Sequence, residues 1–147
     1  MNRRSWLQGI AALLALAVLT PLRALAALWN KPAFEADNVD EALRDLGVTT
    51  TGQSRLIVLI APDMAENGAI VQIEVESLIP DTEAIAILAE KNPTPLLANY
   101  IFGESAVPYV ITRIKMVETA GVKAIVKAGG KYYSASKNVN VAAGSCG

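Results

Sequence analysis

The hydrophobic pattern near residue 40 is that of a short helix with one buried face. Asn38 can cap its first turn, Glu41 stands where a capping box needs an acid, and Gly47 suits a left-handed cap at its end. Such a helix has about two turns and must pack on another element to be stable. The apolar residues recur at the i, i+3, i+4, i+7 spacing of one helical face: Val39, Ala42, Leu43 and Leu46.

Beyond residue 55 the apolar positions recur every second residue or form short continuous runs, which indicates β-strands. Asn67-Gly68, residues 91–95 and Gly129-Gly130 separate them as turns. Because no long helical pattern lies between them, a parallel α/β sheet is disfavoured. The sequence predicts an immunoglobulin-like antiparallel β-sandwich of about seven strands preceded by one short N-terminal helix, with other sandwiches or an open barrel as alternatives. The expected strands are residues 56–61, 71–76, 84–89, 96–102, 110–116, 122–128 and 131–134, with a last short one at 139–141.

Two of the expected strands have more apolar surface than a small sandwich needs. Residues 56–61 and 84–89 are apolar at every position, so both faces of each strand are suited to burial. A sheet with one face in water requires only alternate apolar residues. We therefore expect another subunit to cover one of these strands.

Several polar and aromatic positions fit ordinary sheet faces. Glu74 and Glu76 lie on one face of an expected strand, and nothing nearby desolvates them as a glycosidase carboxylate pair requires. Lys123 and Lys127 likewise indicate a solvated face. The tandem Tyr132-Tyr133 places one ring on each side of a strand, with one side expected to be core.

Residues 1–26 have the composition of an export signal. Arg3-Arg4 precedes an apolar stretch at 10–19, and residues 24–26 give the small-x-small pattern that signal peptidase recognises. The paired arginines resemble a twin-arginine signal, which exports folded proteins, so we expect the protein to be periplasmic. The remaining residues, 27–147, are expected to form a single domain. An ordinary secretory signal is the alternative. A membrane anchor is disfavoured because spanning a bilayer needs about 20 apolar residues.

The composition excludes several kinds of chemistry. The 147 residues include no histidine and one cysteine, Cys146, which excludes a histidine triad, a histidine-ligated zinc or haem, an internal disulfide and a CxxC pair. The charge is nearly balanced, with 13 Lys plus Arg against 14 Asp plus Glu. The basic residues are not clustered in the body of the chain, so neither a nucleic-acid surface nor a membrane surface is expected. We expect no enzyme activity, no cofactor and no metal site.

The thiol near the end of the sequence is the one candidate left for chemistry. Residues 143–147 are too small to dock firmly, so we expect a flexible arm that can extend about 17 Å. Gly144, Ser145 and Gly147 flank Cys146 and let the thiol enter a narrow cleft. A tethered thiol can carry a group covalently from one active site to another. Because the nearby terminal carboxylate disfavours the thiolate, we expect a partner's pocket to activate the sulfur.

The tail and several internal segments resemble the SoxY family, the carrier subunits of the periplasmic thiosulfate-oxidising Sox system. The arm around Cys146 is similar to the family's C-terminal GGCGG arm, and the paired-arginine leader is also as in that family. The resemblance covers residues 34–147. The internal segments occur in family order: Glu66-Asn67-Gly68-Ala69, Glu90-Lys91-Asn92-Pro93-Thr94-Pro95, Thr112-Arg113-Ile114-Lys115-Met116 and Gly130-Lys131-Tyr132-Tyr133.

The resemblance implies a function and a set of partners. Cys146 is then the point where thiosulfate-derived sulfur is attached, and the chain pairs with a SoxZ-like subunit as a heterodimer. In the family a haem enzyme joins thiosulfate to the cysteine, a hydrolase releases sulfate, and a sulfane dehydrogenase is expected to oxidise the remaining sulfur. The chain is thus expected to be a periplasmic carrier and not the catalyst.

The arm departs from the family pattern on both sides of the thiol. Ser145 stands in place of a glycine, and one glycine is missing after Gly147. The serine reduces backbone freedom before Cys146, and the carboxylate lies closer to the sulfur. This leaves open a divergent carrier with a different sulfur substrate. The alternative function is a non-catalytic exported β-sandwich that binds or assembles with other proteins, in which the cysteine is incidental or forms a dimer.

Overall fold

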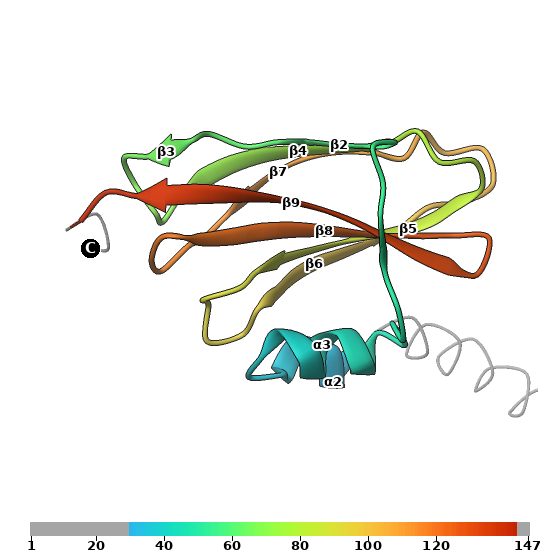
Figure 1. Ribbon diagram of the computed structural model, residues 1–147, viewed down its shortest axis with the longest axis horizontal. Coiled ribbons are helices and arrows are strands. Elements are labelled where there is room, and N and C mark those ends of the chain that lie inside the picture. Colours follow the sequence, from blue (N-terminus) through green and yellow to red (C-terminus); the bar gives the residue numbers. More distant parts are fainter. Residues whose placement is uncertain (1–29, 144–147) are drawn as a thin grey trace, which may run out of the picture. The chain divides into compact units, whose positions relative to one another are not determined.

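The computed structural model describes residues 30–143, and contacts divide the chain into two units, Met1–Lys31 and Pro32–Gly147. The second unit holds two sheets, one of six strands in the order β1-β9-β8-β5-β6 with β3 also paired to β9, and one of three strands in the order β2-β4-β7 (Figure 1). The strands of the larger sheet are β1 (Gly52–Gln53), β3 (Met64–Ala65), β5 (Thr82–Ala89), β6 (Leu96–Ile101), β8 (Ala120–Ala128) and β9 (Lys131–Val141). Those of the smaller sheet are β2 (Ile57–Ile60), β4 (Val71–Ser77) and β7 (Tyr109–Ile114). The predicted immunoglobulin-like β-sandwich is confirmed.

Two details of the strands differ from the prediction. β1 and β3 pair with β9 in parallel, whereas the other pairs are antiparallel. β9 is also a single strand, although residues 131–134 and 139–141 were expected to form separate ones. Its middle residues are small or polar, but continuous pairing with β8 from Ala128↔Lys131 to Ala120↔Val139 holds them in the sheet. Tertiary pairing here overrides weak strand propensity.

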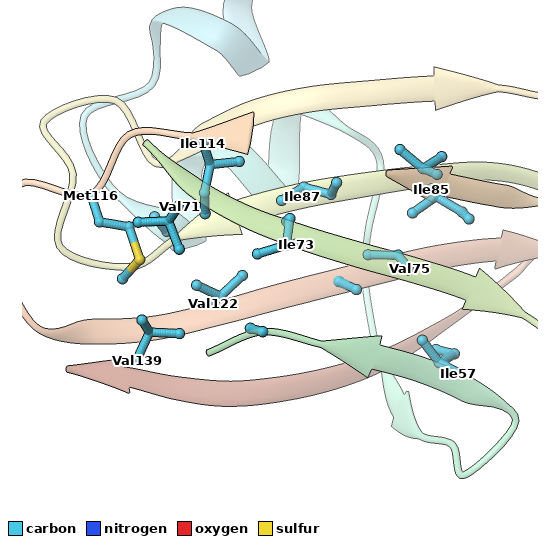
Figure 2. Close-up of a cluster of buried hydrophobic side chains, with 14 of the residues drawn as sticks. Ile57, Val71, Ile73, Val75, Ile85, Ile87, Ile114, Met116, Val122 and Val139 are labelled. Atoms are coloured by element: carbon cyan, nitrogen blue, oxygen red, sulfur yellow. The ribbon is translucent and has the colours of Figure 1, made fainter. Parts of the chain in front are cut away.

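The core lies between the two sheets and is built from alternate residues of their inner faces. In the smaller sheet, Val71, Ile73 and Val75 of β4 are buried while the residues between them face outward. The period of two in the sequence therefore becomes the inner and outer faces of the sheet. Figure 2 shows these side chains directed toward those of the larger sheet, with the labelled residues being Ile57, Val71, Ile73, Val75, Ile85, Ile87, Ile114, Met116, Val122 and Val139.

The predicted helix is present as α3 (Val39–Asp45) and has the expected caps. The Glu41 amide donates to Asn38 Oδ1 at 2.9 Å, which satisfies one of the free N–H groups of the first turn. At the other end Gly47 has φ of +81°, a conformation that glycine adopts without the strain a Cβ causes. A second short helix, α2 (Lys31–Glu35), precedes it and was not predicted.

The two helices cover the outer face of the larger sheet (Figure 1). Ala42 of α3 packs in one cluster with Ala86 and Leu88 of β5, so the run at residues 84–89 is buried on both faces by the chain itself. Tyr132 belongs to this helical side, where its hydroxyl donates to the Leu46 carbonyl at 3.2 Å. Tyr133 packs against the core between the sheets. The prediction that the two rings lie on opposite sides of the strand is confirmed. Among the described residues, no helix is both long and apolar enough to cross a membrane.

Candidate functional site

The residues predicted to carry the chemistry are Gly144, Ser145, Cys146 and Gly147, and they lie outside the described residues. The predicted export signal, residues 1–26, lies outside them as well. The structure does describe the end of β9, which leads to the thiol. We call residues 140–142 the arm root and build the site from the contacts that hold it.

Neighbouring strands and loops fix the backbone of the arm root. β3 pairs in parallel with β9, and the Ala142 amide donates to the Ala65 carbonyl at 3.0 Å. On the other side, the Val141 amide donates to the Thr119 hydroxyl at 2.9 Å. The strand is therefore held from two sides as far as Ala142, and Cys146 follows four residues later.

A lysine on β9 attaches the loop at residues 61–63 to the same strand. Lys137 Nζ lies 3.0 Å from Asp63 Oδ1 and donates to the Ala61 carbonyl at 2.5 Å. Asn140 donates to the Asp63 carbonyl twice, from its backbone N–H and from its Nδ2, each at 3.0 Å. Because the Asp63 side chain is 91% exposed, the ion pair contributes little to stability. The loop is attached to β9 mainly by the hydrogen bonds to backbone carbonyls.

A glycine gives the arm root room to pack. A Cβ on Gly68 would lie 2.4 Å from the Met116 carbonyl oxygen and 2.9 Å from Val141 Cγ1, closer than real Cβ atoms come. The Met116 amide also donates to the Gly68 carbonyl at 2.7 Å. The turn at Asn67-Gly68, predicted from the sequence, therefore serves close backbone approach beside the arm root.

The contacts at Ala142, together with the length of chain that follows, set an upper limit on the distance between the arm root and the thiol. Covalent geometry allows roughly 3.4 Å per extended residue, so the four residues from Ala142 to Cys146 span at most about 14 Å. A thiol on such a tether can be presented to several pockets in turn while it stays at high local concentration. The arrangement suits covalent carriage of a small group. Among residues 30–143, no group of three or more His, Cys, Asp or Glu side chains could hold a metal ion.

The lysines predicted to face water form ion pairs with acids on or beside β5. Lys123 Nζ lies 3.3 Å from Glu90 Oε1, and Lys127 Nζ lies 3.0 Å from Glu83 Oε2. Hydrogen bonds from Lys127 and from the Gly130 amide lower the pKa of Glu83. The hydrogen bond between Lys127 and Glu83 also raises the pKa of Lys127. These pairs join β5 to β8 and to the turn after it, and their role is structural.

A second surface stands out because it is apolar and exposed. The outer side of the three-stranded sheet, which we call the open face, carries together with its margins most of the large exposed apolar side chains of the described chain. In register, Glu76 of the central strand lies between Val58 and Tyr109 of the edge strands, and in the next row Glu74 lies between Ile60 and Ile111. The apolar residues of the open face and its margins are Leu56, Val58, Ile60, Leu78, Val107, Tyr109 and Ile111.

The central strand of the open face supplies its two acids. Glu74 and Glu76 are half-buried there, as expected for residues on one face of a strand. The Tyr109 hydroxyl donates to Glu74 Oε2 at 3.0 Å, and this hydrogen bond raises the pKa of the tyrosine. Glu74 thus has one partner on the face, and no glycosidase-like pair of carboxylates enclosed in a desolvated cleft is formed.

Sequence reasoning missed the residues that hold the arm root. Thr119 and Lys137 carry no local signal, because their partners lie 22 and 76 residues away along the chain. The sequence indicated only one edge strand of the open face. The continuous apolar run at residues 56–61 indicated a doubly apolar strand, but Ile111 on the opposite edge stood between residues assigned to the inner face.

Comparison with known proteins agrees with the fold described above. Residues 44–146 match the family model described as sulfur oxidation protein SoxY, a stretch that includes most of the sandwich and ends on Cys146. The sulfur carrier protein SoxY from Chlorobium limicola f thiosulfatophilum has a similar structure, with a TM-score of 0.66 and 34% identity over 77% of this chain and 99% of that one.

A more distant likeness concerns the fold alone. A superoxide reductase (neelaredoxin) from Ignicoccus hospitalis gives a TM-score of 0.52 at 17% identity, covering 70% of this chain and 88% of that one. No curated protein matches the sequence.

Proposed function

The chain belongs to the SoxY family of sulfur oxidation proteins, and from that membership we propose that it holds thiosulfate-derived sulfur covalently on Cys146 and presents it to Sox enzymes. Membership supports a role as a sulfur carrier and implies Sox-system partners such as SoxZ. The observation that carries the proposal is that the family match ends on the chain's one cysteine, four residues beyond the anchored Ala142.

The chemistry of the proposed carrier balances without a catalytic group on this chain. Joining the Cys146 thiolate to the outer sulfur of thiosulfate forms an S–S bond and releases a pair of electrons, which a haem enzyme accepts. Hydrolysis then breaks the bond between that sulfur and the sulfonate group, with water supplying the oxygen. Sulfate leaves and a persulfide remains on Cys146, which a sulfane dehydrogenase can oxidise further. In each step the carrier contributes the sulfur atom and its tether.

The serine before the thiol is compatible with this role. Ser145 adds a hydroxymethyl group where the family arm has glycine, and serine is small enough to enter a narrow cleft. It restricts the backbone next to Cys146 more than glycine does. We therefore propose the same carrier function, with partner pockets that accept this small side chain.

We further propose that the carrier works in the periplasm as a heterodimer with a SoxZ-like subunit. The paired Arg3-Arg4 leader supports export of a folded protein, which allows a partner without its own signal to travel with it. Fractionation of the host, with Arg3-Arg4 replaced by lysines in a matched strain, tests the route. Loss of the carrier from the periplasm in the variant is expected, and unchanged export would contradict the twin-arginine assignment.

The carrier function is tested by the mass of the protein on Cys146. Carrier purified from cells oxidising thiosulfate should include a species heavier by a sulfur adduct that a reductant removes. Cys146→Ser should lack this species and should abolish thiosulfate oxidation, whereas Ser105→Ala, in the exposed loop after β6, should behave as the wild type. A wild-type protein without any reducible adduct, together with full activity of Cys146→Ser, would refute the proposal.

A second candidate function rests on the open face. An exported sandwich that only binds or assembles with another protein would use this apolar surface and would not need the thiol. In that case Cys146→Ser leaves the physiological function intact, and a charged substitution on the open face removes it. The same pair of variants therefore separates the two functions.

A further inference from the structure

The turn that joins β5 to β6 and the loop that joins β7 to β8 lie at the same end of the sandwich as the arm root. β5 ends beside the start of β8, and β8 starts beside the last residues of β9. The turn predicted at residues 91–95 is present between β5 and β6. One side chain of this turn, that of Asn92, reaches the loop at residues 115–119 and connects the turn to the contacts of the arm root.

The carboxamide of Asn92 holds the loop at residues 115–119 by two backbone groups. Asn92 Nδ2 donates to the Lys115 carbonyl at 2.6 Å, and Asn92 Oδ1 accepts from the Val117 amide at 3.1 Å. Bonds to the C=O of one residue and to the N–H of the second residue after it are those that a parallel β-strand would make. The residue between them, Met116, is fully buried (Figure 2). Asn92 therefore fixes the backbone on either side of a core residue.

The far end of the same loop carries Thr119, whose side chain takes the place of a strand partner for the arm root. The ladder between β8 and β9 ends at the pair Ala120↔Val139, and its register would place residue 118 opposite Val141. The strand has left the sheet there. Instead, the Thr119 hydroxyl accepts from the Val141 amide at 2.9 Å and lies 3.5 Å from the Val141 carbonyl oxygen. The side chain thus holds β9 one pair beyond the end of β8.

We propose that Asn92 and Thr119 are positioning residues for sulfur loading, because together they set the point at which the arm leaves the sheet. The proposal rests on the proposed function, since it concerns the delivery of the Cys146 thiol to partner pockets. Asn92 fixes the loop, the loop carries Thr119, and Thr119 holds Val141, which lies five residues before the thiol. Both residues act through the backbone of the arm root.

The position of the arm root determines the length of the tether. With Ala142 held, the four residues to Cys146 span at most about 14 Å, whereas a strand held only to Val139 leaves seven residues and at most about 24 Å. The effective concentration of a tethered group falls roughly as the −3/2 power of the tether length, so full release lowers it about twofold. Loss of a fixed starting direction adds to this effect, because a displacement of about 1 Å at a reacting atom can slow a reaction about a hundredfold.

The first measurement follows the arm root itself. Thr119→Val keeps the shape of the side chain and removes the acceptor of the Val141 amide, so hydrogen exchange of this amide should be at least fivefold faster, as for one lost hydrogen bond. Asn92→Ala should accelerate the same amide, because the loop that carries Thr119 is released. Thr119→Ser retains the hydroxyl and should exchange slowly. The matched controls are Thr51→Val, exposed before β1, and Asn138→Ala, exposed on β9, and both should exchange as the wild type.

The second measurement asks whether the thiol and its loading respond. Nitroxide labels on Cys146 and on Ser105→Cys, in the exposed loop after β6, give a distance distribution by double electron–electron resonance. This distribution should broaden in Asn92→Ala and Thr119→Val and not in the controls. With thiosulfate and the haem enzyme, whose oxidised haem accepts the electrons, kcat/KM for loading should fall at least twofold in both variants. The reaction of Cys146 with a small aromatic disulfide should keep its wild-type rate, because that reagent does not depend on the position of the tether.

A structural role alone would give a different result. If Asn92→Ala and Thr119→Val only lowered Tm, with an unchanged distance distribution and unchanged loading, the proposal would be overturned. Thr119 is exposed, so Thr119→Val keeps the test decisive if Asn92→Ala folds poorly. Equal exchange of the Val141 amide in Thr119→Val and the wild type would also overturn it.

Failure of this proposal is distinguishable from failure of the carrier function. A wild-type protein without a sulfur adduct in cells refutes the carrier function whatever the variants do. A wild-type protein that carries the adduct, together with Asn92→Ala and Thr119→Val variants that load sulfur at the wild-type rate, leaves the carrier function in place and refutes the positioning role alone.

Discussion

Gly68 provides the sharpest test of how the sandwich holds the arm root. Replacing it by alanine places a Cβ 2.4 Å from the Met116 carbonyl oxygen and 2.9 Å from Val141 Cγ1. Neither neighbour is the far end of a flexible side chain, so backbone on one or both sides must shift. Such overpacking typically costs about 1–3 kcal/mol. Weakening of the 2.7 Å hydrogen bond from the Met116 amide to the Gly68 carbonyl adds about 1 kcal/mol.

The expected loss in the free energy of unfolding is therefore about 2–4 kcal/mol. For a domain of this size each kcal/mol lowers Tm by roughly 4 °C, so the melting temperature should fall by about 8–16 °C. Urea unfolding followed by circular dichroism gives the free energy directly. Hydrogen exchange of the Val141 amide should also accelerate, because its bond to Thr119 depends on the position of the arm root.

The matched control is Gly103→Ala. A Cβ there has nothing within 4 Å, and its φ is not in the left-handed region, so the change in stability should stay within about 0.5 kcal/mol. Equal urea midpoints for Gly68→Ala and Gly103→Ala would refute the argument that close packing at Gly68 positions the arm root.

Two further changes test other parts of the fold. Ala42→Leu inserts a larger side chain where the fully buried Ala42 of α3 packs with Ala86 and Leu88. The overpacking should lower the free energy of unfolding by about 1–3 kcal/mol and expose α3 to proteolysis. The control, Asp40→Ala on the outer side of the helix, should leave α3 docked. Because hydrogen bonds from Lys127 lower the pKa of Glu83 in the folded state below its ordinary 4.5, the contribution of this group to stability is present above that value and is lost as the pH falls through the folded pKa. Glu83→Gln should therefore be less stable than the wild type at neutral pH, and urea titrations at decreasing pH should converge below pH 4.5; a difference that persists or grows in acid contradicts the assignment.

Local chemistry explains what could be predicted from the sequence. The helix α3 was located because its caps, Asn38 and Gly47, act within one turn of the chain. The strands of the core were located because burial on one face imposes a period of two. β1 and β3 could not be found in this way, since each has only two residues and exists through pairing with β9.

The contacts around the arm root show why the rest was beyond sequence reasoning. Thr119 and Lys137 look like ordinary polar residues until the sandwich brings their partners to the same end of β9. The turn predicted at Asn67-Gly68 is present. A glycine is required there because the Met116 carbonyl and the Val141 side chain leave no room for a Cβ, and no local sequence pattern contains that information. The cysteine itself was found because its type and its small neighbours define its chemistry.

The two sheets divide the work of a carrier between them. The middle strands of the larger sheet, β5 and β8, are buried by the core on one face and by the chain's own helices on the other, and the neighbouring strand β9 leads to the thiol. The smaller sheet keeps its outer face apolar and exposed. A carrier whose sulfur must visit several pockets cannot surround the thiol with its own residues, so specificity has to come from surfaces outside the arm. The open face is such a surface, because its strands β2 and β7 lead into the loops whose hydrogen bonds hold the arm root.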